Sequence, residues 1–231
     1  MTQLENDAIH IWHTTLDHHI KHYPMFQHWL SAEEKERAEK LKPPYRQRFT
    51  LTRGLLRKLL SDYSGQPPEK IRFSYTLSGK PLLLNPSLKK SIEFNVSHSR
   101  NRVAFAFAWD TPLGIDLEYK TPRKYIDKIA YRFFSIDDYA QLKKLSGKEK
   151  LNTFFNAWVR NEALVKALGY SLKTHPCSQY MINLDKASTA LNKEKCPCSL
   201  FTLVLHPDFA AALAIKGQAK RIIIKQYDGN F

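Results

Sequence analysis

Two short stretches of this chain combine carboxylates and a lysine at spacings that suit chemistry on a phosphate. The sequence GIDLE at 114–118 places Asp116 and Glu118 two residues apart, and such residues point to the same face of a strand. The sequence WVRNEALVK at 158–166 predicts a helix in which Glu162 and Lys166 share a face, where they also suit an i,i+4 salt bridge. Three carboxylates beside a lysine are what Mg²⁺-assisted phosphate chemistry needs.

Other segments of the sequence must hold these four residues in place. Ser31 is followed three residues later by Glu34, which predicts a capping box and a helix to about residue 41. A strongly basic helix is expected over about 45–63 and a long helix over about 149–168, with Gly169 as its C-terminal cap. Strands are predicted at 9–14, 71–75, 93–97, 102–109, 114–118, 179–185, 199–206, 209–215 and 222–225.

The two halves of the predicted element order are alike. Each ends in a hairpin of apolar strands, over 93–109 and 200–215, and each hairpin follows a helix. This pattern favours an α+β fold built from a duplicated unit, with one half at 1–111 and the other at 112–231.

Composition limits the classes of protein that fit. The 231 residues are 43% hydrophobic, enough for a sizeable core, and no apolar run approaches the length of a membrane span. The polar start does not resemble a secretory signal, and three cysteines without framework spacing favour reduced thiols, so we expect a cytoplasmic protein. The net charge of +14 favours a polyanionic partner, such as nucleic acid, an anionic membrane, a phosphate-rich small molecule or an acidic protein, although a solubilising surface is the alternative.

Five motifs in order resemble one enzyme family. They are SGKP at 78–81, FNVSHS at 94–99, GIDLE at 114–118, RFFS at 132–135 and WVRNEALVK at 158–166. Together they resemble the 4′-phosphopantetheinyl transferases of the surfactin-synthetase-activating (Sfp) type, over about residues 31–172. The resemblance implies a pseudo-dimer of two similar α/β subdomains, with the active site in the cleft between them, in a monomeric protein.

The resemblance also implies a reaction and its participants. The enzyme would transfer 4′-phosphopantetheine from coenzyme A to a serine of an apo acyl or peptidyl carrier protein, with Mg²⁺ and with release of 3′,5′-ADP. Asp116, Glu118 and Glu162 would hold the metal. Glu162 would also act as the base, directly or through a metal-bound water, and Lys166 would contact the α-phosphate.

Coenzyme A binding is assigned to further residues by the same resemblance. Ser97 and His98 would hydrogen-bond its phosphates, and the turn with Lys80 and Pro81 would lie near the nucleotide. The binding residues drawn from the basic helix are Arg48, for the 3′-phosphate, and Arg53.

One departure from the family pattern keeps alternatives open. The family usually has Lys-Glu in the helix motif, whereas this chain has Asn161-Glu162. The lost positive charge suggests a lower rate or an altered carrier preference. A catalytically weakened relative that only binds coenzyme A or carriers is one alternative. A basic nucleic-acid-binding protein is another, but the sequence shows no helix-turn-helix, zinc-finger or aromatic RNA-binding signature.

The charge generates a first prediction. A net charge of +14 raises the encounter rate with coenzyme A and with an acidic carrier protein. The apparent affinity for carrier protein should therefore fall steadily as NaCl is raised from low to high ionic strength, measured as KM for carrier. A KM that stays flat across this range would contradict an electrostatic role for the basic surface.

Overall fold

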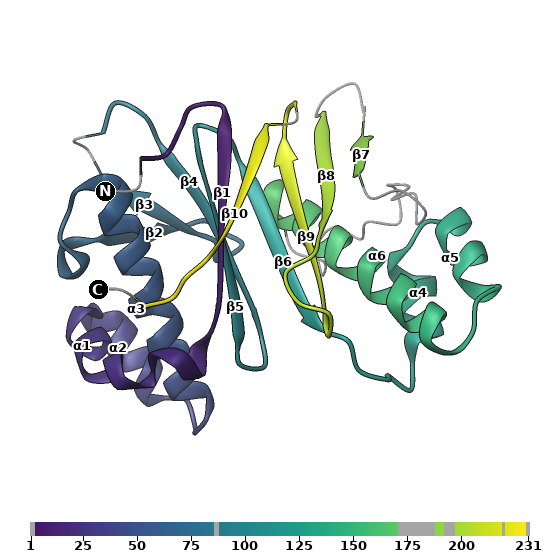
Figure 1. Ribbon diagram of the computed structural model, residues 1–231, viewed down its shortest axis with the longest axis horizontal. Helices are drawn as coiled ribbons and strands as arrows, with labels where there is room; N and C mark the ends of the chain where they lie inside the picture. Colours follow the sequence, from purple (N-terminus) through teal and green to yellow (C-terminus); the bar gives the residue numbers. More distant parts are fainter. Residues whose placement is uncertain (1–2, 86–87, 171–187, 192–196, 219, 230–231) are drawn as a thin grey trace.

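Four layers make up the molecule, in the order helices, sheet, sheet, helices (Figure 1). The structure is a computed structural model that describes residues 3–85, 88–170, 188–191, 197–218 and 220–229. The first sheet has the strand order β10-β1-β5-β4, with β1 at Ala8–Thr15, β4 at Ile92–Ser99, β5 at Arg102–Trp109 and β10 at Arg221–Gln226. Its pairings are antiparallel except for the parallel pair β1–β10.

The second sheet is antiparallel throughout. Its order is β6-β9-β8-β7, with β6 at Leu113–Tyr119, β7 at Ser188–Leu191, β8 at Cys198–Leu203 and β9 at Phe209–Lys216. β6 lies at one edge of this sheet and β4 lies at one edge of the first sheet. These two edge strands contact each other, so the sheets meet where the catalytic motifs were predicted.

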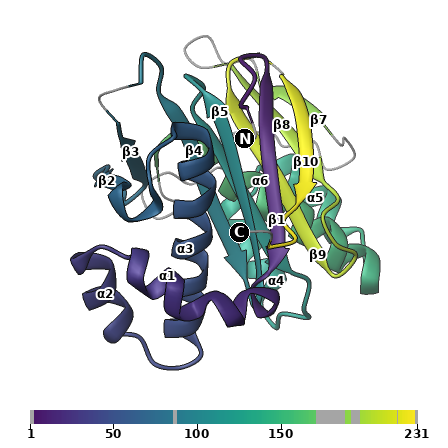
Figure 2. The same cartoon turned by 60° about the vertical axis from the view of Figure 1, so that its left-hand side comes forward.

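The N-terminal helices cover the outer face of the first sheet (Figure 2). They are η1 (Leu16–His22), α1 (Tyr23–Trp29), α2 (Ala32–Glu39), α3 (Tyr45–Ser64) and η2 (Pro68–Lys70), and a small hairpin of β2 (Arg72–Tyr75) and β3 (Pro81–Leu84) follows. Ser31 and Glu34 form the predicted capping box at the start of α2. The buried leucines of α3 pack with Phe94, Phe105 and Phe107 of the sheet, which fixes the basic helix against β4 and β5.

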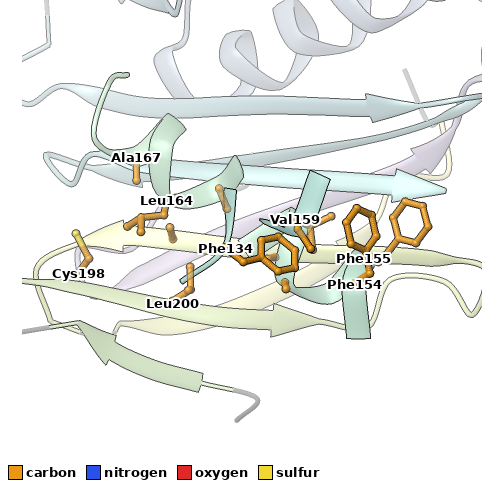
Figure 3. Close-up of a cluster of buried hydrophobic side chains, with 14 of the residues drawn as sticks. Phe134, Phe154, Phe155, Val159, Leu164, Ala167, Cys198 and Leu200 are labelled. Carbon is orange, nitrogen blue, oxygen red and sulfur yellow. The ribbon is translucent and has the colours of Figure 1, made fainter. Parts of the chain in front are cut away.

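The helices of the second half cover the outer face of the second sheet. They are α4 (Ile126–Phe133), α5 (Ile136–Lys143) and α6 (Gly147–Ala167). Figure 3 shows part of the cluster beneath them, in which Phe154, Val159 and Leu164 of α6 pack with Leu200 of β8. Burying this apolar face of α6 determines which of its residues are left for chemistry.

A third core lies between the two sheets. Along β5, Val103, Phe105 and Phe107 pack toward the N-terminal helices, while the alternate residues Ala104 and Ala106 pack toward the second sheet. The central strand β9 is likewise buried on both faces, which explains why 103–109 and 209–215 read as continuous apolar runs. The alanines of β5 share this core with larger side chains such as Ile115 and Leu213 of the second sheet.

The predicted α+β class is confirmed, and the predicted helices and strands in the described residues occur within a few residues of their expected bounds. One assignment differs. Residues 221–226 were placed in the C-terminal half, but β10 pairs with β1 in the first sheet. Local sequence cannot specify the partner of a short strand, and here the unpaired edge of β1 accepts it.

The strand predicted at 179–185 lies outside the described residues. Among those described, no helix is long and apolar enough to cross a membrane.

A glycine permits the close approach of β6 to α6. A Cβ placed on Gly114 would lie 2.2 Å from the carbonyl oxygen of Ala163 and 2.5 Å from the backbone nitrogen of Ala167. Both atoms belong to the helix backbone, so neither can move without displacing α6. Gly114 therefore sets the distance between the strand that carries Asp116 and the helix that carries Lys166.

This contact predicts a loss of stability. Gly114→Ala should lower the free energy of unfolding by about 2–3 kcal/mol through overpacking, measured by urea denaturation. Gly147→Ala is the matched control, because nothing lies within 4 Å of its Cβ and only its positive φ of 54° opposes the change. The control should cost about 1 kcal/mol. Equal stability of Gly114→Ala and wild type would contradict the packing account.

Candidate active site

The two halves are joined by hydrogen bonds from side chains of β4 to the backbone edge of β6. Three alternate residues of β4, Asn95, Ser97 and Ser99, take part, because alternate side chains of a strand point to one face. The main-chain N–H groups of Ile115, Leu117 and Tyr119 donate to Asn95 Oδ1 at 2.9 Å, Ser97 Oγ at 3.2 Å and Ser99 Oγ at 3.0 Å, respectively. These three contacts, which we call the β4–β6 ladder, satisfy the N–H groups of an edge strand.

The same serines hold the two carboxylates of β6. Ser97 Oγ donates to Asp116 Oδ1 at 2.8 Å, and Ser99 Oγ donates to Glu118 Oε2 at 3.1 Å. Each serine therefore accepts a hydrogen bond from the β6 backbone and donates one to a β6 side chain. Asp116 and Glu118 lie on one face of the strand, as their spacing predicts, and the serines of β4 reach both carboxylates from the edge of β6.

Lys166 of α6 reaches the same carboxylate from the other side. Its Nζ lies 2.6 Å from Asp116 Oδ1 and donates to the carbonyl oxygen of Ile115 at 3.2 Å. Asp116, rather than Glu162, is thus its carboxylate partner in this structure. Asp116 is buried, whereas the side chain of Lys166 keeps 27% of its exposure. The ammonium remains accessible to a ligand.

Two hollows meet at α6. The larger hollow, of about 820 Å³, is lined by the turn that contains Lys80 and Pro81 and by Asn95, Arg132, Phe133, Trp158 and Tyr170. The smaller hollow, of about 270 Å³, is lined by Ser97, His98, Asp116 and Glu118. Glu162 and Lys166 line both hollows. Eight of the ten predicted site residues are brought together in this way.

Burial, together with the negative charge of neighbouring carboxylates, raises the pKa of two glutamates in the site. Burial raises the pKa of Glu162 to about 7, and the negative charge of Asp116 adds to this effect, while Lys166 opposes it. Burial and Asp116 also raise the pKa of Glu118, against the influence of Arg123, whose Nη2 lies 3.5 Å from Glu118 Oε2. Such a site is short of positive charge near neutral pH.

Cationic groups surround the hollows. Loss of water contact lowers the pKa of the Lys80 ammonium, which donates to the carbonyl oxygen of Leu113 at 2.9 Å. The surrounding protein likewise lowers the pKa of His98, with smaller contributions from the positive charges of Lys166 and Arg48. Arg48 does not line either hollow, but its charge acts on the His98 imidazole that does.

Arg53 lies elsewhere. Its guanidinium is buried, with Nε 3.5 Å from Glu34 Oε1 and Nη2 donating to the hydroxyl of Tyr75 at 3.2 Å. It lines neither hollow. The predicted role of Arg53 in coenzyme A binding stays a prediction, and the structure gives this residue other partners.

The helix residues that flank Glu162 face the protein interior. Asn161 is fully buried and Arg160 is 2% exposed, and neither lines a hollow. Trp158 stacks on Phe154 and meets Phe133 edge-on, as expected for a side chain that anchors the helix, but it also lines the larger hollow. The family departure at Asn161 therefore concerns a core position.

The residues present fit a divalent cation in their chemistry. In the described part of the chain, no group of three His, Cys, Asp or Glu side chains is arranged to hold a metal ion as it stands, and Lys166 occupies one oxygen of Asp116. The other oxygen, Oδ2, is buried with no hydrogen-bond partner. A hard cation would satisfy this oxygen and offset the negative charge of Asp116, which adds to the effect of burial on the pKa of Glu162.

Several site residues were not predicted from the sequence. Asn95 and Ser99 have structural roles in the ladder, and their signal was available, since 95, 97 and 99 alternate as small polar residues on a strand. Arg132 and Tyr170 line the larger hollow without having been assigned a role. No spacing rule connects them to residue 162, because only tertiary packing places them there.

Comparisons with known proteins show which family this chain is similar to. A family model for the N-terminal part of 4′-phosphopantetheinyl transferases matches residues 12–109, and the model of the 4′-phosphopantetheinyl transferase superfamily matches residues 112–214. The two matches meet between β5 and β6, where the first sheet gives way to the second.

Curated relatives match most of the chain. The 4′-phosphopantetheinyl transferase HetI of a Nostoc species is 33% identical over 93% of this chain and 90% of its own length. The 4′-phosphopantetheinyl transferase psf-1 of Bacillus pumilus is 31% identical over 83% of this chain and 81% of its own length. Sfp of Bacillus subtilis is 29% identical over 81% of this chain and 83% of its own length. The chain belongs to the 4′-phosphopantetheinyl transferase superfamily. The predicted family and the predicted enzyme class are confirmed.

The raised pKa of Glu162 predicts how stability depends on pH. Between its usual pKa of 4.5 and about 7, the folded protein holds a proton that the unfolded chain releases, so stability without metal should fall as pH rises through this window. Glu162→Gln should remove this loss. With a chelator present, we expect its melting temperature to exceed that of wild type by about 2–6 °C at pH 8, and by much less at pH 5.

The control for this measurement is Glu39→Gln, which changes an exposed carboxylate at the end of α2. It should shift the melting temperature little at either pH. If Glu162→Gln shifts the melting temperature at pH 8 no more than this control does, the pKa of Glu162 is not raised as the geometry predicts.

Proposed function

We propose that this transferase uses Mg²⁺ to move 4′-phosphopantetheine from coenzyme A to a serine hydroxyl of an apo acyl or peptidyl carrier protein, with release of 3′,5′-ADP. The observation that carries this proposal is the convergence of Asp116, Glu118, Glu162 and Lys166 where both hollows meet. Family membership gives the class of reaction, and these residues supply the chemistry that it requires.

Coenzyme A would occupy the hollows on either side of Lys166. A space of about 820 Å³ is within the range of natural small-molecule sites. Lys80 and Pro81 would lie beside the nucleotide, and His98 would donate to a phosphate oxygen. Ser97 was predicted to contact the phosphates as well, but its single hydroxyl proton is donated to Asp116 Oδ1, so we propose that it acts by holding Asp116. Arg48, whose charge acts on His98, would bind the 3′-phosphate, since a planar guanidinium suits a terminal phosphate.

Asp116, Glu118 and Glu162 would hold the Mg²⁺. A few carboxylates together with phosphate and water are the ligands that this ion prefers, and the buried Oδ2 of Asp116 is available to it. When bound, the ion neutralises charge on the pyrophosphate. Lys166, which now pairs with Asp116, would then turn its ammonium to the α-phosphate.

The reaction itself is an in-line displacement. The oxygen of the carrier serine forms a bond to the phosphorus that bears pantetheine, and the bond from that phosphorus to the oxygen of the departing 3′,5′-ADP breaks. Glu162 would accept the serine proton, directly or through a water molecule, because its carboxylate lies where both hollows meet. Lys166 and His98 stabilise the negative charge on the leaving phosphate.

The partner would be an acidic carrier protein or carrier domain. The net charge of +14 favours association with both acidic carriers and coenzyme A. One chain supplies both halves of the site, since β4 and β6 come from different halves and meet in the ladder. We therefore expect a monomer to be active.

The experiment that tests this function is intact-mass analysis of an apo carrier protein after incubation with the enzyme, coenzyme A and Mg²⁺. We expect a gain of one phosphopantetheine group, lost with a chelator and lost in Glu162→Ala. Glu39→Ala, which alters an exposed carboxylate of α2, should retain the activity.

Two other outcomes would change the conclusion. No gain with several types of carrier, while coenzyme A still binds, would identify a catalytically weakened relative. Transfer that survives the chelator and Glu162→Ala would refute the roles given to the metal and to Glu162.

A further inference from the structure

The β2–β3 hairpin lines part of the larger hollow, but it is too small to be stable by itself. Its turn contributes Ser78, Gly79, Lys80 and Pro81 to the lining. The hairpin is an isolated pair of strands, four residues each, outside both main sheets. Isolated two-stranded hairpins are marginally stable in water. The position of Lys80 therefore depends on contacts made from outside the hairpin.

A buried ion cluster anchors the start of β2. Glu34 is 3% exposed and Arg57 is 1% exposed, with Arg57 Nη2 2.7 Å from Glu34 Oε2. Arg57 Nη1 also donates to the carbonyl oxygens of Pro68 at 2.8 Å and Ile71 at 3.0 Å. One arginine of α3 thus ties the chain that enters β2 to both α2 and α3.

Arg53 extends the same cluster to the other end of β2. Its Nε lies 3.5 Å from the second oxygen of Glu34, and its Nη2 donates to the Tyr75 hydroxyl at 3.2 Å. The guanidinium also lies over the Phe73 ring, 5.3 Å from its centroid. Arg53 is one helical turn before Arg57 on α3, so both reach β2 from the same side of the helix.

Tyr75 is directly followed by the turn that carries Lys80. The N–H of Thr76 donates to the carbonyl oxygen of Lys80 at 3.0 Å, and the N–H of Lys80 donates to Thr76 Oγ1 at 3.0 Å. The Lys80 ammonium then reaches across to the carbonyl oxygen of Leu113, at the start of β6. The connection from Glu34 to the wall of the hollow thus consists of an ion pair with Arg53, a hydrogen bond from Arg53 to the half-exposed Tyr75, and the turn that follows Tyr75.

We propose that Arg53 and Tyr75, with Glu34 behind them, are positioning residues that hold the Lys80 turn against the coenzyme A site. This inference rests on the proposed function. It gives Arg53 a different role from that of a phosphate ligand, because its guanidinium already pairs with Glu34, donates to Tyr75 and lies over the ring of Phe73. A misplaced Lys80 weakens binding of coenzyme A and leaves Asp116, Glu118 and Glu162, which would hold the metal, in place.

The test uses two variants. Tyr75→Phe removes only the hydroxyl that accepts from Arg53, and Arg53→Met removes the guanidinium while keeping an unbranched side chain in its place. Each should raise KM for coenzyme A about three- to ten-fold, with kcat within two-fold of wild type. The KM of the double variant should not exceed that of Arg53→Met alone, since both changes break the same Arg53–Tyr75 hydrogen bond. Tyr125→Phe, an exposed tyrosine at the start of α4, is the matched control and should leave KM unchanged.

A second readout does not depend on catalysis. Amide hydrogen exchange at Thr76, Gly79 and Lys80 should be faster in Tyr75→Phe than in wild type or Tyr125→Phe, because the turn loses an anchor. If wild type transfers no phosphopantetheine, the proposed function fails, and the exchange rates still test the positioning role.

Two results would overturn the inference. One is an unchanged exchange rate and an unchanged KM in Tyr75→Phe. The other is a normal KM in Tyr75→Phe and Arg53→Lys, with a raised KM only in Arg53→Met. That pattern would show that Arg53 serves through its charge alone, as a direct phosphate ligand does.

Discussion

The β4–β6 ladder is the constraint on which the rest of the site depends. Two sheet edges meet, and the N–H groups of β6 are satisfied by side chains of β4 instead of by another strand. The same hydroxyls then orient Asp116 and Glu118. The same hydrogen bonds therefore join the two halves and orient the carboxylates. A change that breaks the β4–β6 ladder also displaces the site.

The third carboxylate and the lysine arrive by a different route. α6 is held by an apolar face that packs on the second sheet, and its approach to β6 is limited by backbone contact at Gly114. This close packing brings Lys166 onto Asp116 and leaves Glu162 between the two hollows. The helix core thus fixes the spacing of groups that come from different elements. The raised pKa of Glu162 reflects first its burial on α6 and then the negative charge of Asp116.

Much of this arrangement was accessible from the sequence, because its signals are local. The i, i+2 carboxylates, the placement of Glu162 and Lys166 on one face of α6 and the capping box at Ser31 each depend on one element, and each appears as predicted, although Lys166 pairs with Asp116 instead of Glu162. The pairing of β10 with β1 depends on tertiary packing and was not predictable. The partner of Arg53 was missed for a similar reason: a basic helix shows its charge in the sequence, whereas the buried Glu34 that pairs with it is distant in the chain.

The central claim is that the ladder holds the carboxylates in position to bind one divalent cation. Calorimetric titration of Mg²⁺ into wild type and Ser97→Ala, each saturated with 3′,5′-ADP, tests it most directly. Ser97→Ala removes the hydroxyl that contacts both the β6 backbone and Asp116. The account predicts one Mg²⁺ site per chain in wild type and an affinity about ten-fold lower in the variant. Equal affinity in the two proteins, or no binding to wild type, would contradict it.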